Sequence, residues 1–272
     1  MPLVRPLPVF LISFNRGPML DGVIRSLRRQ SVPVDIVIHD NGSTDPQTID
    51  VLDRLERSGT ATVVRRPAIQ TADDLDLVDE TVQAYFSGRE PGPYAVSDCD
   101  ISLAVADKHA LATYLELLAG HPEVECVGPM LRISDIPQSY PLFNFVMNRH
   151  VSQFWQHEPT IEASSRGEVA FQAALIDTTL AVHRAGDQFR RLKAGLRVYE
   201  PYEAQHLDWY LTVPPQDTYA KTSNSQIAHW NSPEWLAEHG GDHLRWPEYT
   251  VVRRGRRRRL VLEKRQAADH PR

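Results

Sequence analysis

The chain contains two aspartates, Asp98 and Asp100, separated by one residue at the end of a short apolar run at residues 94–96. Alternate residues of a strand point the same way, so both carboxylates could aim at one point beyond the strand end. A hard divalent cation, with phosphate oxygens as its other ligands, would offset their repulsion. The pair therefore predicts a metal and phosphate site. The alternative is two solvated turn aspartates, because aspartate is common where strands end.

Two more polar clusters follow apolar runs earlier in the chain. Asp40 opens the string D-N-G-S-T-D after the run at residues 35–39, and Ser13, Asn15 and Arg16 end the run that begins at Val9. Ligands of open α/β sheets bind outside the carboxyl ends of the strands, so we expect these clusters to meet the aspartate pair in one cleft. The alternatives are a turn-capping aspartate at position 40 and a solvated loop around the asparagine and arginine.

The elements that must position these residues alternate between strand and helix over the first half of the chain. Continuous apolar runs predict strands buried on both faces, and apolar residues at helical spacing predict amphipathic helices between them. We expect strands at residues 9–13, 35–39, 60–65, 94–96 and 124–132, and helices at residues 19–29, 48–57, 72–86 and 107–119. The pattern predicts an α/β fold with a mostly parallel, mixed central sheet flanked by helices.

The second half carries fewer signals. The run at residues 171–183 predicts a strand pair or one long strand, interrupted by Asp177, for which a structural role and a site role are both open. Around Asp208, aromatic residues and a histidine recur at helical spacing, which predicts a helix over residues 201–210. Residues 249–263 predict a hairpin around a glycine turn.

Composition limits the class of protein. The chain has 272 residues, is 42% hydrophobic and has a formal net charge of −5, which predicts a folded globular protein and indicates no polyanion partner. Its two cysteines lie in apolar runs, which favours reduced thiols and a cytoplasmic protein. We expect neither a membrane span nor a signal peptide, because no apolar run is long enough and the first residues lack an apolar core.

Three strings together carry a resemblance to a known family. They are V-F-L-I-S-F-N-R at residues 9–16, D-I-V-I-H-D-N-G-S-T-D at residues 35–45 and S-D-C-D at residues 97–100. In this order they resemble the nucleotide-sugar-binding half of GT-A glycosyltransferases, above all the large inverting group called family 2. The resemblance implies a donor-binding half at residues 1–132 and an acceptor-binding, catalytic half of the same domain at residues 133–248. A basic hairpin and tail at residues 249–272 would follow.

The resemblance also implies roles for single residues. The loop after the first strand would border the base and ribose of the nucleotide through Ser13, Asn15 and Arg16. Asp40 would accept a hydrogen bond from the base, and Asp98 would face the ribose or the metal. Asp100 would ligate Mn²⁺ or Mg²⁺ bridging the diphosphate. A cation there would stabilise the charge that grows on the leaving nucleoside diphosphate.

The catalytic base and the last metal ligand follow less directly. Inverting members carry an acidic base near the start of a helix at this point in chain order, within an E-D or D-x-D-like string that this chain lacks. We predict Asp208 as the base, with Asp177 and His206 as the other candidates, because a base must take the proton of the acceptor hydroxyl. His229 is the candidate for a late histidine ligand of the metal, with an ordinary loop histidine as the alternative.

These features predict a metal-dependent glycosyltransferase of the hexosyltransferase class. It would move a sugar from a nucleotide-diphosphate donor, with UDP-sugars favoured, to a hydroxyl acceptor such as a glycan or glycolipid, with inversion. Arginine fills six of the seven positions from Arg253 to Arg259, which could bring peripheral membrane contact or remain a solvated hairpin; nucleic acid is not an expected partner.

Two other functions remain open. A sugar-1-phosphate nucleotidyltransferase shares the sheet topology, but it carries a glycine-rich loop with a basic residue that residues 13–18 lack. A non-catalytic, GT-A-like binding module would use the basic hairpin to dock on a membrane or on nucleic acid, with strong salt dependence. A dinucleotide-binding enzyme is disfavoured because the first loop lacks the G-x-G-x-x-G fingerprint.

Overall fold

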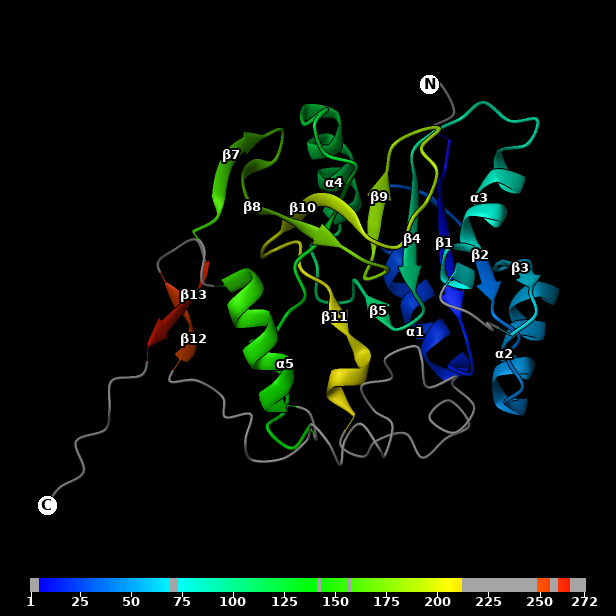
Figure 1. Ribbon diagram of the computed structural model, residues 1–272, viewed down its shortest axis with the longest axis horizontal. Helices are drawn as coiled ribbons and strands as arrows, with labels where there is room; N and C mark the ends of the chain where they lie inside the picture. Colours follow the sequence, from blue (N-terminus) through cyan, green and yellow to red (C-terminus); the bar gives the residue numbers. More distant parts are fainter. Residues whose placement is uncertain are drawn as a thin grey trace, which may run out of the picture.

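A computed structural model describes residues 5–68, 73–140, 143–155, 158–211, 249–254 and 259–264. Nine of the described strands form one sheet in the order β3-β2-β1-β4-β9-β6-β10-β8-β7, which runs from right to left in Figure 1. The nine strands are β1 (Leu7–Ser13), β2 (Val34–Asp40), β3 (Thr62–Arg65), β4 (Tyr94–Asp98), β6 (Cys126–Pro129), β7 (Thr160–Ser164), β8 (Gly167–Ile176), β9 (Ala181–His183) and β10 (Lys193–Val198).

Most strands of this sheet share one direction. β1 is parallel to β2 and β4, β2 to β3, and β6 to β10. β9 is antiparallel to both β4 and β6, and β8 is antiparallel to both β10 and β7. Among the nine described strands, β8 and β9 thus run against the other seven. The predicted mostly parallel, mixed central sheet flanked by helices is confirmed.

Helices cover both faces of the sheet, because its central strands are apolar on both sides. The described α-helices are α1 (Gly17–Arg28), α2 (Pro46–Arg57), α3 (Val78–Phe86), α4 (Ala110–Gly120) and α5 (Phe143–His150). Within β1, Val9 and Leu11 pack in the same core cluster as Leu20 of α1. Phe10 points to the other face and packs in a second cluster with Val82 of α3.

The predicted helix at residues 72–86 is shorter than expected: a 3-10 turn at Asp73–Asp76 precedes α3. The predicted helix at residues 201–210 is wrong. There, β11 (Gln205–His206) pairs antiparallel with β5 (Ile101–Ser102), and a 3-10 turn at Leu207–Tyr210 follows. The backbone of this segment therefore bonds to the strand beside the aspartate pair rather than to itself.

The predicted C-terminal hairpin is confirmed by the antiparallel pairing of β12 (Tyr249–Arg254) with β13 (Arg259–Lys264). A π-helical turn at Val151–Trp155 extends α5. None of the helices in the described part of the chain combines the length and apolarity that crossing a bilayer requires.

Candidate functional site

The carboxyl ends of β1, β2 and β4 lie level at one edge of the sheet. The register places Ser13 opposite Asp40 and Ile12 opposite Asp98. The three polar clusters therefore lie at the same edge of the sheet, as parallel neighbours should, while their meeting in one ligand-binding cleft stays a prediction. We call this side of the molecule the carboxyl edge.

Asn15 joins the first two loops of the carboxyl edge. Its φ of 49° is in the left-handed region, which asparagine tolerates better than most residues. Its Oδ1 accepts hydrogen bonds from the backbone N–H groups of Thr44 (2.7 Å) and Asp45 (2.9 Å). Its own N–H donates to the Ser43 hydroxyl at 2.9 Å. Three hydrogen bonds therefore join the two loops at Asn15.

Asp40 is buried and bonded within its own turn. Its Oδ2 accepts from the Ser43 N–H at 2.9 Å, and its Oδ1 accepts from the Ser43 hydroxyl at 2.5 Å. The turn-capping alternative is thus observed, while the contact of Asp40 with a base stays a prediction. Ser13 is fully buried, and its hydroxyl has no hydrogen-bond partner among the described residues.

Asp98 and Asp100 do not aim at one point. β4 ends at Asp98, so strand alternation does not extend to Asp100, and the two carboxylates find different partners. Asp98 accepts from the Thr178 hydroxyl at 2.7 Å and donates its N–H to the Thr178 carbonyl at 2.7 Å. Burial, with repulsion from Asp100, raises the pKa of Asp98 to about 8.

Arg16 bridges Asp100 and Asp208. Its Nη1 lies 2.5 Å from Asp100 Oδ2 and 2.7 Å from Asp208 Oδ1, and its Nη2 donates to Asp208 Oδ2 at 2.7 Å. All three side chains are less than a tenth exposed, at 6%, 8% and 9%. The sequence predicted a nucleotide contact for Arg16; this ion-pair network joins positions 84 and 192 residues apart, and no local pattern indicates it.

Asp100, His206 and Asp208 form a candidate metal-binding set, which we call the carboxylate–histidine set. One ligand atom from each lies within 4.8 Å of the others, and His206 Nδ1 is 3.8 Å from Asp100 Oδ2. Ligands on opposite sides of a hard cation are roughly 4 to 5 Å apart, so this spacing fits one ion. Asp100 Oδ1 and His206 Nδ1 are buried and have no described hydrogen-bond partner, as ligand atoms would without their ion.

The set differs from the predicted ligands. It replaces Asp98 by two residues that the sequence singled out as base candidates, His206 and Asp208. His206 is held by parallel stacking on Trp209, with ring centroids 4.8 Å apart. The backbone also helps, because the Leu207 N–H donates to the Asp100 carbonyl at 2.8 Å. The aromatic spacing that suggested a helix thus belongs to the turn that brings this segment to Asp100.

Asp177, the remaining base candidate, is tied to its surroundings. It accepts from the Thr179 N–H (3.2 Å) and hydroxyl (2.7 Å) and lies 3.7 Å from Arg197. Burial alone would raise the pKa of Asp177, but the charge of Arg197 and the Thr179 bonds hold it below its usual range. Asp177 therefore has the structural role that the sequence left open, and a catalytic role for it stays a prediction.

Two further predictions fall wholly or partly on undescribed parts of the chain. His229 lies outside the described residues. Of the basic stretch, Arg253, Arg254 and Arg259 belong to the described strands of the hairpin, while residues 255–258 lie outside them.

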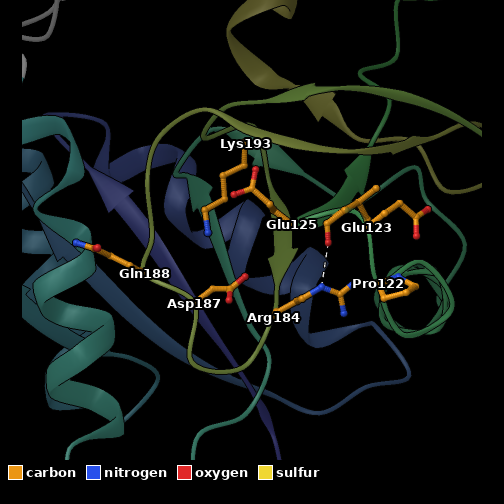
Figure 2. Close-up of a pocket in the computed structure, with 8 residues that line it drawn as sticks. Pro122, Glu123, Glu125, Arg184, Asp187, Gln188 and Lys193 are labelled. Atoms are coloured by element: carbon orange, nitrogen blue, oxygen red, sulfur yellow. Dashed lines mark hydrogen bonds between the residues drawn. The ribbon is translucent and has the colours of Figure 1, made fainter.

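A pocket of about 430 Å³ opens at the opposite side of the sheet, near the start of β6 and β10 (Figure 2). We call this side the amino edge. The pocket is lined by Pro122, Glu123, Val124, Glu125, Arg184, Asp187, Gln188 and Lys193. Arg184 donates to the carbonyls of Leu118 (2.8 Å), His121 and Val124 (2.9 Å). The Glu125 carboxylate pairs with Arg190 and accepts from the Ala194 N–H at 3.0 Å. The charged groups of Arg184 and Glu125 thus already have hydrogen-bond or ion-pair partners within the protein.

No protein-family model and no curated protein matches the chain. Among solved structures, the chain is similar to the mannosyltransferase PcManGT from Pyrobaculum calidifontis in complex with GDP-Man and Mn²⁺. The identity is 15%, the TM-score 0.45, and the alignment covers 81% of this chain and 61% of that one. It is also similar to S. aureus TarS 1-349, with 14% identity, a TM-score of 0.39 and coverage of 66% and 47%.

A third similar structure is glucosyl-3-phosphoglycerate synthase from Mycobacterium tuberculosis in complex with Mn²⁺, uridine-diphosphate and glucosyl-3-phosphoglycerate. The identity is 16%, the TM-score 0.33, and the coverage 54% and 52%. The chain thus spans 61% of the first structure and about half of the other two. The first of these structures is named a mannosyltransferase and the third a synthase. At such low similarity they carry no argument for function, which has to rest on the residues of this chain.

Proposed function

We propose that the chain is a divalent-metal-dependent glycosyltransferase that uses a nucleoside-diphosphate sugar as donor. The observation that carries the proposal is the buried carboxylate–histidine set of Asp100, His206 and Asp208 beside the loops of Asn15 and Asp40. A hard cation takes carboxylate oxygens readily, and a diphosphate supplies further oxygen ligands. An open α/β sheet binds its ligands at the edge where these residues lie.

Different residues of the site would have different roles. The joined loops of Asn15 and Asp40 would position the base and ribose, and Asp100 with His206 would hold Mn²⁺ or Mg²⁺. The bound cation would stabilise charge on the leaving diphosphate. Asp208 remains our choice of base, which takes the proton of the acceptor hydroxyl. Both of its oxygens contact Arg16 at 2.7 Å, so that contact has to open before Asp208 can act.

The finer features of the proposal follow the resemblance. Residues 1–132 would bind the donor, with UDP-sugars favoured, and residues 133–248 would bind a glycan or glycolipid acceptor and complete the site. Transfer to the hydroxyl acceptor would proceed with inversion and give a hexosyltransferase. The basic hairpin, Arg253–Arg259, would contact an anionic membrane surface.

The test is a donor screen followed by a turnover assay. UDP-, GDP-, dTDP- and CMP-sugars are added with Mn²⁺ while thermal unfolding is measured, because a ligand raises the melting temperature by mass action. We expect one diphosphate donor to raise it and then to be hydrolysed or transferred. CMP-sugars, which carry a single phosphate, serve as the control. A screen in which no donor binds and none is hydrolysed would contradict the proposal.

A variant separates the two roles of Asp208. As a base alone, Asp208→Asn should lose transfer and retain the Mn²⁺ affinity of the wild type. If Asp208 is needed as a metal ligand, the same variant should lose both, and Asp177 would become the leading base candidate.

A further inference from the structure

Arg16 lies on the acidic residues that a cation would use. Its Nη1 contacts Asp100 Oδ2 at 2.5 Å, and that oxygen is also the one 3.8 Å from His206 Nδ1. The guanidinium engages both oxygens of Asp208 as well. The planar fork of arginine suits such double contacts, so the arrangement is well formed and not a chance approach of charges.

Two atoms of the set remain open to a ligand. Asp100 Oδ1 and His206 Nδ1 are buried and have no hydrogen-bond partner among the described residues. A buried polar atom without a partner is costly, because little water reaches it. A divalent cation would bind both atoms and bring two positive charges to the carboxylates that Arg16 now contacts.

The cation and Arg16 compete for the same place. A cation held by Asp100, His206 and Asp208 would lie within a few ångströms of the guanidinium in its present position. Repulsion between a double and a single positive charge is strong at that distance when water is largely excluded. One of them has to move, and arginine has a long side chain that can do so.

We infer that Arg16 is an exchangeable counter-ion: it neutralises the carboxylate–histidine set without donor and is displaced when the divalent cation binds. Displaced, its guanidinium pairs with the diphosphate of the donor, for which planar bidentate geometry is well suited. Arg16 then couples metal binding to donor binding, so neither ligand binds tightly alone. This inference rests on the proposed function and adds to it the order of events at the same site.

The experiment measures Mn²⁺ affinity by calorimetry without any nucleotide. Arg16→Met removes the competing charge and keeps a long side chain, so we expect Mn²⁺ to bind at least about tenfold tighter than to the wild type. Arg25→Met is the matched control, because Arg25 is exposed on α1, the helix that begins directly after Arg16; it should leave the affinity unchanged. Unchanged or weaker Mn²⁺ binding by Arg16→Met would overturn the inference.

A second measurement repeats the titration with UDP or GDP present. In the wild type the nucleotide should tighten Mn²⁺ binding, and by reciprocity Mn²⁺ should tighten nucleotide binding by the same factor. In Arg16→Met, the factor by which the nucleotide tightens Mn²⁺ binding should fall to about a tenth of its wild-type value or less. Coupling as strong as that of the wild type would count against the role of Arg16.

The titrations without and with nucleotide test the exchange at Arg16 and the proposed function separately. Absence of nucleotide binding to the wild type would refute the proposed function, while the nucleotide-free arm would still decide the exchange at Arg16. If Arg16→Met does not fold, Arg16→Lys keeps one positive charge without the fork. Mn²⁺ should then bind several-fold tighter than to the wild type, because lysine pairs with only one carboxylate. Wild-type affinity in Arg16→Lys would overturn the inference.

Discussion

The two edges of the sheet each hold a buried or half-buried arginine, and the two arginines are used differently. At the amino edge, Arg184 donates to the backbone carbonyls of Leu118, His121 and Val124, of which Figure 2 shows the bond to Val124. At the carboxyl edge, Arg16 faces two buried carboxylates, beside a carboxylate oxygen and a ring nitrogen that lack described partners. An arginine that satisfies carbonyls completes the fold, whereas one that contacts acids able to ligate a cation occupies the place of a ligand.

The difference separates stability from function. Removing a side chain at the amino edge should change the free energy of unfolding and leave ligand binding intact. Removing one at the carboxyl edge should change metal and nucleotide binding as well. Each of the following measurements places one residue on one side of this division.

The largest effect is expected at Asp100. Asp100→Asn removes a negative ligand from the carboxylate–histidine set, so transfer and donor hydrolysis should fall by about 10³-fold or more while the fold remains. The matched control is Asp187→Asn in the amino-edge pocket, which should retain activity within about twofold. Full turnover by Asp100→Asn, or wild-type turnover unchanged by EDTA, would show that the transfer does not depend on a metal.

The next effect is on stability. Arg184→Met leaves the carbonyls of Leu118 and Val124 without this donor, while the His121 carbonyl keeps the Val124 N–H. We therefore expect the free energy of unfolding to fall by about 2 to 4 kcal/mol in urea denaturation. Arg190→Met, which loses an exposed ion pair with Glu125, should change the free energy of unfolding much less than Arg184→Met does, because water screens an exposed pair.

Mn²⁺ distinguishes the two arginines in thermal denaturation. Mn²⁺ should raise the melting temperature of Arg16→Met by more degrees than it raises the melting temperature of the wild type. The increase for Arg184→Met should be no larger than the increase for the wild type. Equal effects of Mn²⁺ on the two variants would contradict the claim that Arg16 affects metal binding and Arg184 does not.

A pH effect should belong to the amino edge. His183 is buried against Tyr94, and burial, with the nearby charge of Lys193, lowers its pKa to about 3. Between that value and the ordinary pKa of about 6.5, the unfolded chain binds more protons than the folded one. Stability from the neutral ring is therefore complete above pH 6.5 and is lost as pH falls towards 3.

The measurement compares the wild type with His183→Leu across that window. The stability advantage of the wild type should shrink by up to about 1.4 kcal/mol per pH unit on acidification. A constant difference between the two proteins from pH 6.5 to pH 4 would show that His183 does not titrate as its burial implies.

The smallest effect is expected at Ser43. Its hydroxyl joins Asn15 to Asp40, so Ser43→Ala should loosen the joined loops and weaken UDP or GDP binding by about five- to tenfold. Calorimetric titration of the nucleotide with Mn²⁺ measures this. Ser58→Ala, far along α2 at its C-cap, is the control. An unaltered nucleotide affinity in Ser43→Ala would exclude this turn from the nucleotide-binding site.

The alternating strands and helices of the first half could be predicted because each element is encoded locally. Apolar runs such as residues 9–13 and helical spacing in α1 and α2 depend only on near neighbours. The level strand ends follow from parallel pairing, so the placement of Asp40 and Asp98 at the same edge of the sheet could also be foreseen.

The segment around His206 could not be predicted in the same way. Its aromatic spacing imitates a helix, but Gln205 and His206 pair with β5, which is about a hundred residues earlier in the chain. Likewise, Arg16 meets Asp208 only because tertiary packing brings together residues 192 positions apart. Local periodicity carries no information about such partners, and the carboxylate–histidine set therefore emerged only from the structure.

The most direct test of the account is whether His206 ligates the cation. Electron spin echo spectroscopy of Mn²⁺ bound with UDP or GDP reports coupling to a ligating ring nitrogen. We predict one Mn²⁺ site with such coupling in the wild type and its loss in His206→Gln, with Mn²⁺ bound more weakly. Mn²⁺ without nitrogen coupling, or coupling that persists in His206→Gln, would contradict the assignment of His206, together with Asp100, as a ligand of the metal.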